Sequence, residues 1–244
     1  EFTYSIDVSA NYTSQFSTHI FQSMAVKSGT TLDLDADITG TNLTGTLTVE
    51  DGATLNMNGN DINDASLSAG QVVIEEGATL LIPQGSTFPT SNDGSDYYVT
   101  GSISGGNVST FIYSSNTVAE LNASGTNNMV IGDLIINGGG LFQLSSDIGT
   151  NAGQINIENL HIDSGTVIIP VGVDATALNI TVGEHGTLRL LNDNSDIPAD
   201  VTLEEGSTVF YDQTTTQDIA AWTNPYYNLR IGDSGNDNGA TAQK

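Results

Sequence analysis

The sequence predicts an all-β protein, a single-stranded parallel β-helix (β-solenoid) of about eight coils with an N-terminal capping strand. One phrase, apolar–x–apolar–x–x–Gly–x–Thr–apolar–x–apolar, recurs at spacings that mostly lie between 20 and 26 residues. Apolar residues alternate with polar ones on both sides of the glycine, which is typical of short strands with one buried face. Apolar residues do not persist at helical spacing, and threonine, asparagine and glycine are spread along the whole chain.

The repeats define the coils. The clearest copies of the phrase span residues 24–34, 47–57, 72–82 and 201–211. The corner positions are Gly29, Gly52, Gly77, Asn116, Gly139, Gly165, Gly186 and Gly206. Glycine adopts the positive φ that a sharp corner requires. A single repeat cannot bury its apolar face alone, so we expect the repeats to stack about 4.8 Å apart in a right-handed solenoid. A β-sandwich would not repeat one phrase at a regular distance.

The chain divides into three segments. Residues 1–23 are predicted to be an N-terminal capping strand or a strand exchanged with a neighbouring subunit, because apolar residues alternate strictly over residues 2–12. Residues 24–232 form the predicted solenoid, with an insertion loop at about 83–107 that accounts for the long gap between the corners at 77 and 116. Residues 233–244 resemble the start of a truncated further coil or a tail, so we expect a piece of a longer protein.

The composition excludes several functions. The chain has 4 basic and 29 acidic residues and a formal charge of −25. Nucleic-acid binding needs lysine and arginine to neutralise phosphates, and docking on an anionic membrane needs them as well. No apolar run approaches the ~20 residues that cross a bilayer, so membrane insertion is not expected. The absence of cysteine excludes disulfides and is compatible with an exported protein. No signal peptide is recognisable, so an export signal is expected to have been removed or left out.

Carboxylates recur immediately before the corner glycines. Glu50 and Asp51 precede one corner, and Glu75 and Glu76 precede the next. In stacked coils these side chains would lie one strand spacing apart, where like charges repel. Ca²⁺ prefers carboxylate and carbonyl oxygens, so it is the candidate cofactor at these four residues. The alternative is that they are solvated carboxylates on a turn, since neither an EF-hand loop nor a calcium-binding nonapeptide repeat is present.

Threonine recurs after the corners. Thr31, Thr54, Thr79 and Thr208 are expected to stack as one ladder, with Thr166 and Thr187 one step off. An ice-binding array would show regular Thr-x-Thr ranks, and here only residues 44–48 form one. Stacked threonine is also what an ordinary β-solenoid face favours.

Aromatic residues outside the apolar pattern are the candidate ligand-binding residues. Tyr97 and Tyr98 lie in the predicted insertion loop, and a long loop on a rigid scaffold is a natural binding site. Trp222 lies close to Tyr226 and Tyr227. These rings have the shape to stack on sugars or to cover the end of a coil, and for the second group we favour the covering role.

A stretch near the C-terminus resembles a known repeat. Its elements are residues 208–212 (TVFYD), residues 217–219 (QDI) and residues 226–231 (YYNLRI). Together they resemble a repeat of large exported, adhesin-like surface proteins of Bacteroidota-type bacteria. The resemblance implies an extracellular, cell-surface, non-catalytic solenoid segment, and it supplies no binding residues.

No catalytic centre is predicted. Parallel β-helix enzymes that cleave acidic polysaccharides need basic residues to hold uronates, and four scattered basic residues cannot line such a groove. The three histidines have no metal-ligand spacing, and no nucleophile motif is present. A hydrolase of neutral glycans needs only two suitably separated carboxylates, so it stays open as an alternative.

The sequence therefore predicts a non-catalytic structural or adhesive segment at the cell surface. Its expected partners are further copies of itself, with which it forms fibres, or neighbouring surface proteins and glycans. The first alternative is a carbohydrate- or Ca²⁺-dependent binding module, and the second is a β-helix glycan hydrolase.

Overall fold

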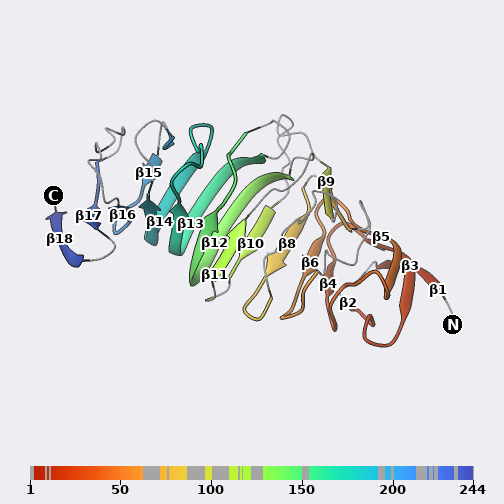
Figure 1. Ribbon diagram of the computed structural model, residues 1–244. Helices are drawn as coiled ribbons and strands as arrows, with labels where there is room; N and C mark the ends of the chain where they lie inside the picture. Colours follow the sequence, from red (N-terminus) through yellow and green to blue (C-terminus); the bar gives the residue numbers. More distant parts are fainter. Residues whose placement is uncertain are drawn as a thin grey trace.

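The protein is built entirely from strands in the part of the chain that the structure describes. The computed structural model describes residues 3–8, 10, 12–62, 72–75, 77–86, 97–100, 110–114, 116, 118–121, 129–149, 154–191, 196–198, 201–212, 219, 222, 225–233 and 236–243. Its parallel sheets form a β-solenoid of about seven turns, and no helix occurs among these residues. The predicted fold class is confirmed. The two ends of the chain lie at opposite ends of the stack (Figure 1).

Two sheets make up the solenoid. A five-stranded parallel sheet contains β1 (Thr3–Val8), β3 (Ile20–Val26), β5 (Leu43–Val49), β7 (Val72–Glu75) and β9 (Tyr97–Thr100), in that order. The other sheet has 13 strands. It runs through β2 (Tyr12–Thr13), β4 (Thr31–Asp33), β6 (Thr54–Asn56), β8 (Thr79–Ile82), β10 (Thr110–Tyr113), β12 (Met129–Leu144), β13 (Ile155–Ile169), β14 (Asn179–Leu190), β16 (Thr208–Tyr211), β17 (Asn228–Asp233) and β18 (Asn236–Gln243). Two further strands, β11 (Val118–Leu121) and β15 (Val201–Leu203), pair with β12 and β14.

The alternation in the sequence decides which side chains enter the core. Leu32, Leu55 and Leu80 occupy one register position of β4, β6 and β8, and each is fully buried. Their neighbours along each strand point outward and are half-buried. Because a one-residue slip would turn every leucine to the solvent, this pattern also fixes the register between coils.

Most predicted corner glycines adopt the expected conformation. Gly29, Gly52 and Gly77 have φ values of 75°, 72° and 80°, and their amides are linked from coil to coil by hydrogen bonds of 3.0 and 3.1 Å. Gly139 and Gly186 differ, because they lie inside the long strands β12 and β14 and do not have positive φ. Gly186 is needed there for a different reason: a Cβ atom would lie 2.0 Å from the carbonyl oxygen of Ile162.

The predicted insertion at about 83–107 is not a loop throughout. It contains β9, which continues the five-stranded sheet beyond β7. The next strand, β10, stacks on β8 and then on the first half of β12. The second half of β12 pairs with β11 instead. In the first coils, the strands of this column, such as β8, come after the corner glycine. From β10 onward, the strands of the same column come before the corner position.

Both ends of the chain are integrated into the sheets. Within the predicted capping segment 1–23, β1 pairs in parallel with β3, and β2 pairs in parallel with β4, so these strands form a first turn of the solenoid. Within 233–244, predicted as the start of a further coil or a tail, β18 instead folds back antiparallel onto β17. Figure 1 shows this return at the C-terminal end of the stack.

Candidate functional site

The outer face of the thirteen-stranded sheet extends over most of the stack. Outward-pointing side chains of successive strands stack in register and form two neighbouring ladders. The central ladder consists of Thr13, Asp33, Asn56, Leu81, Ile112, Ile135, His161, Thr181 and Thr202. The side ladder consists of Thr31, Thr54, Thr79, Thr110, Asp133, Asn159 and Asn179. Figure 1 shows these strands side by side from β2 to β15.

The middle of the central ladder is apolar. Leu81, Ile112 and Ile135 point outward from three adjacent strands and are only half-buried. The inward residues of the same strands, such as Phe111, are completely buried. Polar residues continue the ladder on both sides, so three coils present an aliphatic stripe in an otherwise polar ladder.

Polar side chains next to this stripe are paired from rung to rung. The Asn56 amide donates to the Asp33 carboxylate over 2.7 Å in the central ladder. In the side ladder the Asn159 amide donates to the Asp133 carboxylate over 2.8 Å. Each carboxylate on this face is thus held by the amide of the next coil, which keeps its position fixed along the ladder.

The predicted threonine ladder divides into two. Thr31, Thr54 and Thr79 stack in the side ladder, which Thr110 extends. Thr208 belongs to another column, where it follows Thr166 and Thr187 in register. Because the strand columns shift between β8 and β12, threonines at the same step of the phrase come to lie in different columns.

The four predicted metal ligands show how acidic corners are accommodated. Glu50 follows β5 and accepts a hydrogen bond from Lys27, whose Nζ lies 2.6 Å from its Oε1. Glu75 ends β7 one coil further on, and Glu76 lies outside the described residues. The Asp51 carboxylate lies over Gly77, where a Cβ atom would be 2.0 Å from its oxygen. Within the described part of the chain, no group of three or more His, Asp or Glu side chains has a metal-binding arrangement.

The candidate aromatic ligand sites differ in their surroundings. Tyr97 and Tyr98 begin strand β9, opposite Val72 and Val73 of β7. They therefore belong to a sheet rather than to a protruding loop. Trp222 is 9% exposed and belongs to the core, which favours the predicted role of covering a coil over that of an accessible sugar-stacking residue.

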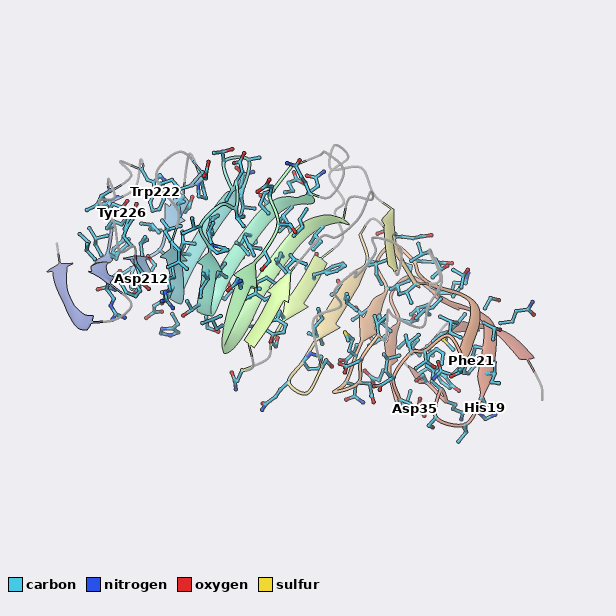
Figure 2. The ribbon with its side chains drawn as sticks, in the orientation of Figure 1. His19, Phe21, Asp35, Asp212, Trp222 and Tyr226 are labelled. Atoms are coloured by element: carbon cyan, nitrogen blue, oxygen red, sulfur yellow. The ribbon has the colours of Figure 1, made fainter. Side chains whose placement is uncertain are left out.

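Trp222 packs in the core near the C-terminal end of the stack (Figure 2). Its Nε1 donates to the carbonyl oxygen of Pro198 over 3.0 Å. The ring packs against Tyr211 and Tyr226 at centroid distances of 6.4 and 5.4 Å. The two tyrosine hydroxyls lie 2.8 Å apart, and burial together with this hydrogen bond raises the pKa of Tyr226 above its usual range. An apolar ring with a satisfied N–H is what a buried tryptophan requires.

Replacing Trp222 with phenylalanine tests this role. The change keeps an apolar ring but removes the N–H group, which leaves the buried Pro198 carbonyl oxygen without its donor. We expect a loss of about 1–2 kcal/mol in the free energy of unfolding, measured by urea denaturation. The exposed neighbour Tyr227 is the control, and Tyr227→Phe should leave stability unchanged. Equal stability of the Trp222→Phe variant and the wild type would contradict the structural role.

Asp35 organises the turn that precedes β3 (Figure 2). Its Oδ1 accepts from the Ser14 hydroxyl over 2.6 Å and from the Phe16 amide over 2.8 Å. Its Oδ2 accepts from the Ser17 hydroxyl. Burial by itself raises the pKa of Asp35, but these hydrogen bonds outweigh it and place the pKa below its usual 3.8. The carboxylate thereby holds Phe16 against Phe21, with ring centroids 5.0 Å apart.

We expect Asp35→Asn to lower the free energy of unfolding by about 1–2 kcal/mol at pH 7. Because the pKa is lower in the folded state, the stabilisation is present above the unfolded-state pKa and is lost as the pH falls through the folded value. The difference between wild type and variant should therefore shrink below about pH 4. Thermal melts at pH 7, 4 and 2.5 measure it, with the exposed Asp163→Asn as control. A difference that grows on acidification would refute this account.

In several coils an aspartate directly precedes a buried isoleucine. Ile38, Ile62, Ile148 and Ile197 enter the core. The preceding aspartates link coils: the Asp37 carboxylate accepts from the Asp61 amide over 2.9 Å, and the Asp147 carboxylate accepts from the Asp174 amide over 2.8 Å. In the described residues, Asp37 and Asp147 therefore have a structural role, since each links its coil to the next.

Sequence reasoning missed the cluster around Asp212. This carboxylate is buried, and its Oδ2 accepts from the Nε of Arg189 over 2.7 Å, while Arg189 Nη2 also contacts Oδ2. Arg189 and Arg230 lie over Phe210 at 5.6 and 4.8 Å from its centroid. Aligning Thr187 with Thr208 in the repeated phrase would have placed Arg189 beside Phe210.

The motif that resembles surface-protein repeats also has structural contacts. Asn228 donates through its side-chain amide to the carbonyl oxygens of Gly206 and Ser207, over 2.9 and 3.1 Å. Leu229 is buried beside it, stacked on Val209. The tyrosine, asparagine and leucine of this motif therefore join β17 to the preceding coil.

Comparison with family models found no match, and comparisons with curated proteins and with solved structures found no significant match. Among the described residues there is no helix of the length and apolarity that crossing a membrane would require. The fold and the surfaces above are therefore the basis for a functional assignment.

Proposed function

We propose that the chain is a non-catalytic structural and adhesive segment of an exported protein at the cell surface, where it acts as a stiff acidic spacer. The observation that carries this proposal is continuous stacking. Eleven strands follow one another in the main path of the larger sheet. At about 4.8 Å per strand the stack is roughly 48 Å long.

The contacts between coils support a mechanical role. Hydrogen-bond ladders, inward leucine and isoleucine columns, and asparagine–aspartate pairs all link each coil to the next. Stability in such a stack is a sum of the contacts between neighbouring coils, so each additional coil adds its own ladder of backbone hydrogen bonds to the rod. The charge of −25 favours solubility and discourages nonspecific collapse between neighbouring molecules.

Small-angle X-ray scattering and limited proteolysis test the rod. We expect a monodisperse particle of 25.4 kDa, or a small multiple of it, with one dimension clearly longer than the others. The strand segments should resist protease under conditions that degrade an unfolded control. Antibody labelling of intact source cells tests the location, and signal from lysed cells alone would overturn the surface assignment.

Calcium tests the alternative of a Ca²⁺-dependent module. Because Lys27 already pairs with Glu50, we expect CaCl₂ and NaCl at equal ionic strength to raise the melting temperature equally, through screening of the −25 charge. A larger rise with Ca²⁺, lost in Glu75→Gln, would instead favour a specific site at the acidic corners. Scanning calorimetry measures both.

A further inference from the structure

The central ladder is close to palindromic in its chemistry. Ile112 occupies the middle of its nine rungs, with Leu81 and Ile135 on either side. Beyond them lie Asn56 and His161, then Asp33 and Thr181, and finally Thr13 and Thr202 at the two ends. An isologous interface requires that one surface complement itself in this way.

We propose that this face of the solenoid is a docking surface for a second copy of the chain, packed laterally and antiparallel about a two-fold axis at the Ile112 rung. This inference rests on the proposed structural role and names its partner. Leu81 would meet Ile135 of the second copy, and Ile112 would meet its own equivalent. The aliphatic stripe would thus be removed from water along its full length.

Charge decides the orientation of the two copies. In the antiparallel arrangement Asp33 faces Thr181 of the second copy, and Asn56 faces its His161. In the side ladder Asp133 faces Thr79 of the second copy, and every such pair is able to form a hydrogen bond. In a parallel arrangement Asp33 would face Asp33, and the like charges would repel.

The area of the two ladders sets the expected affinity of the dimer. The two ladders are about 38 Å long and roughly 10 Å wide, which gives about 400 Å² per copy. Such an area is at the weak end of specific interfaces, so we expect a dissociation constant of about 0.1–1 mM. Because each copy carries −25, association should strengthen as salt screens the repulsion. High local concentration at a surface favours the dimer by mass action.

Sedimentation equilibrium in 0.05 and 0.5 M NaCl tests the interface. We expect wild-type dimer at high salt, and a dissociation constant raised about tenfold or more in Ile112→Asp. Ile112→Thr should also weaken the dimer. Because threonine already occupies other rungs of the ladder, this variant is expected to fold even if Ile112→Asp does not. The matched control is Val73→Asp, which changes an outward, half-buried valine of β7 in the other sheet and should dimerise as wild type does.

Cross-linking tests the orientation, because the chain has no cysteine of its own. A mixture of Asn56→Cys and His161→Cys proteins should form a mixed disulfide dimer, while neither protein should cross-link with itself. Self-linked Asn56→Cys dimers would overturn the antiparallel arrangement. A wild type that stays monomeric at millimolar concentration would overturn the interface. An elongated monomer in scattering would leave the spacer role standing, and a compact particle would reject that role.

Discussion

Gly165→Ala is expected to lower the free energy of unfolding by about 3–5 kcal/mol. Gly165 lies in β13 with φ of 83°, a conformation that alanine adopts at a cost of about 1–2 kcal/mol. The larger effect comes from the neighbouring coil. A Cβ atom would lie 2.1 Å from the carbonyl oxygen of Gly138 and 2.8 Å from that of Gly140, and both are backbone atoms of the stacked strand. The coils would have to separate locally, which disturbs the ladder on both sides.

Gly29→Ala is the matched control for this prediction. Gly29 has a similar φ of 75°, but a Cβ atom there would meet no atom within 4 Å. We expect this variant to lose only about 1–2 kcal/mol, the cost of the conformation alone. Urea denaturation of both variants separates conformation from close packing. Equal losses would show that the approach of the coils at Gly165 is not a constraint on stability.

Arg189→Met is expected to lower the free energy of unfolding by about 3–5 kcal/mol. The side chain of Asp212 is completely buried, and Arg189 is the charged partner that contacts it. Removing the guanidinium would leave a buried carboxylate without compensation, which is far more costly than the loss of a surface pair. The contact of Arg189 with the Phe210 ring would be lost as well, although methionine retains part of that packing.

A double-mutant cycle identifies the cause of this loss. Asp212→Asn removes the buried charge, so the Arg189→Met/Asp212→Asn double variant should be more stable than Arg189→Met alone. Lys27→Met is the comparison at the other ion pair, where both side chains are about one third exposed, and we expect a loss below about 1 kcal/mol. If the double variant loses as much as the sum of the single variants, the buried carboxylate is not the source of the effect.

The tolerance of this fold to substitution therefore differs between positions at the contacts of neighbouring coils and outward positions. Backbone contacts between coils at Gly165 and the buried pair at Asp212 leave little room for change. Outward positions such as Thr202 are exposed and should accept most residues that favour strands.

The inward residues and the corners could be predicted because each depends on a local pattern in the sequence. Alternation around Leu32, Leu55 and Leu80 identified inward residues, and the glycines at 29, 52 and 77 identified corners, because strand periodicity and positive φ are properties of a few consecutive residues. The sequence left Trp222 between ligand binding and covering a coil, and the structure places its ring in the core. Its burial depends on Pro198 and Tyr211, which are distant in the sequence and become neighbours only through stacking.

The sequence by itself determined the class of fold, the inward face of each strand and the spacing of the coils. Only the tertiary structure decided which strand of one coil stacks on which strand of the next coil. The shift at β10 separates Thr79 from Thr208 and brings Leu81, Ile112 and Ile135 into one outward stripe. Strand periodicity is local, whereas the choice of neighbour depends on pairing across intervening segments of different lengths. For that reason the outer ladders emerge only when the coils are stacked.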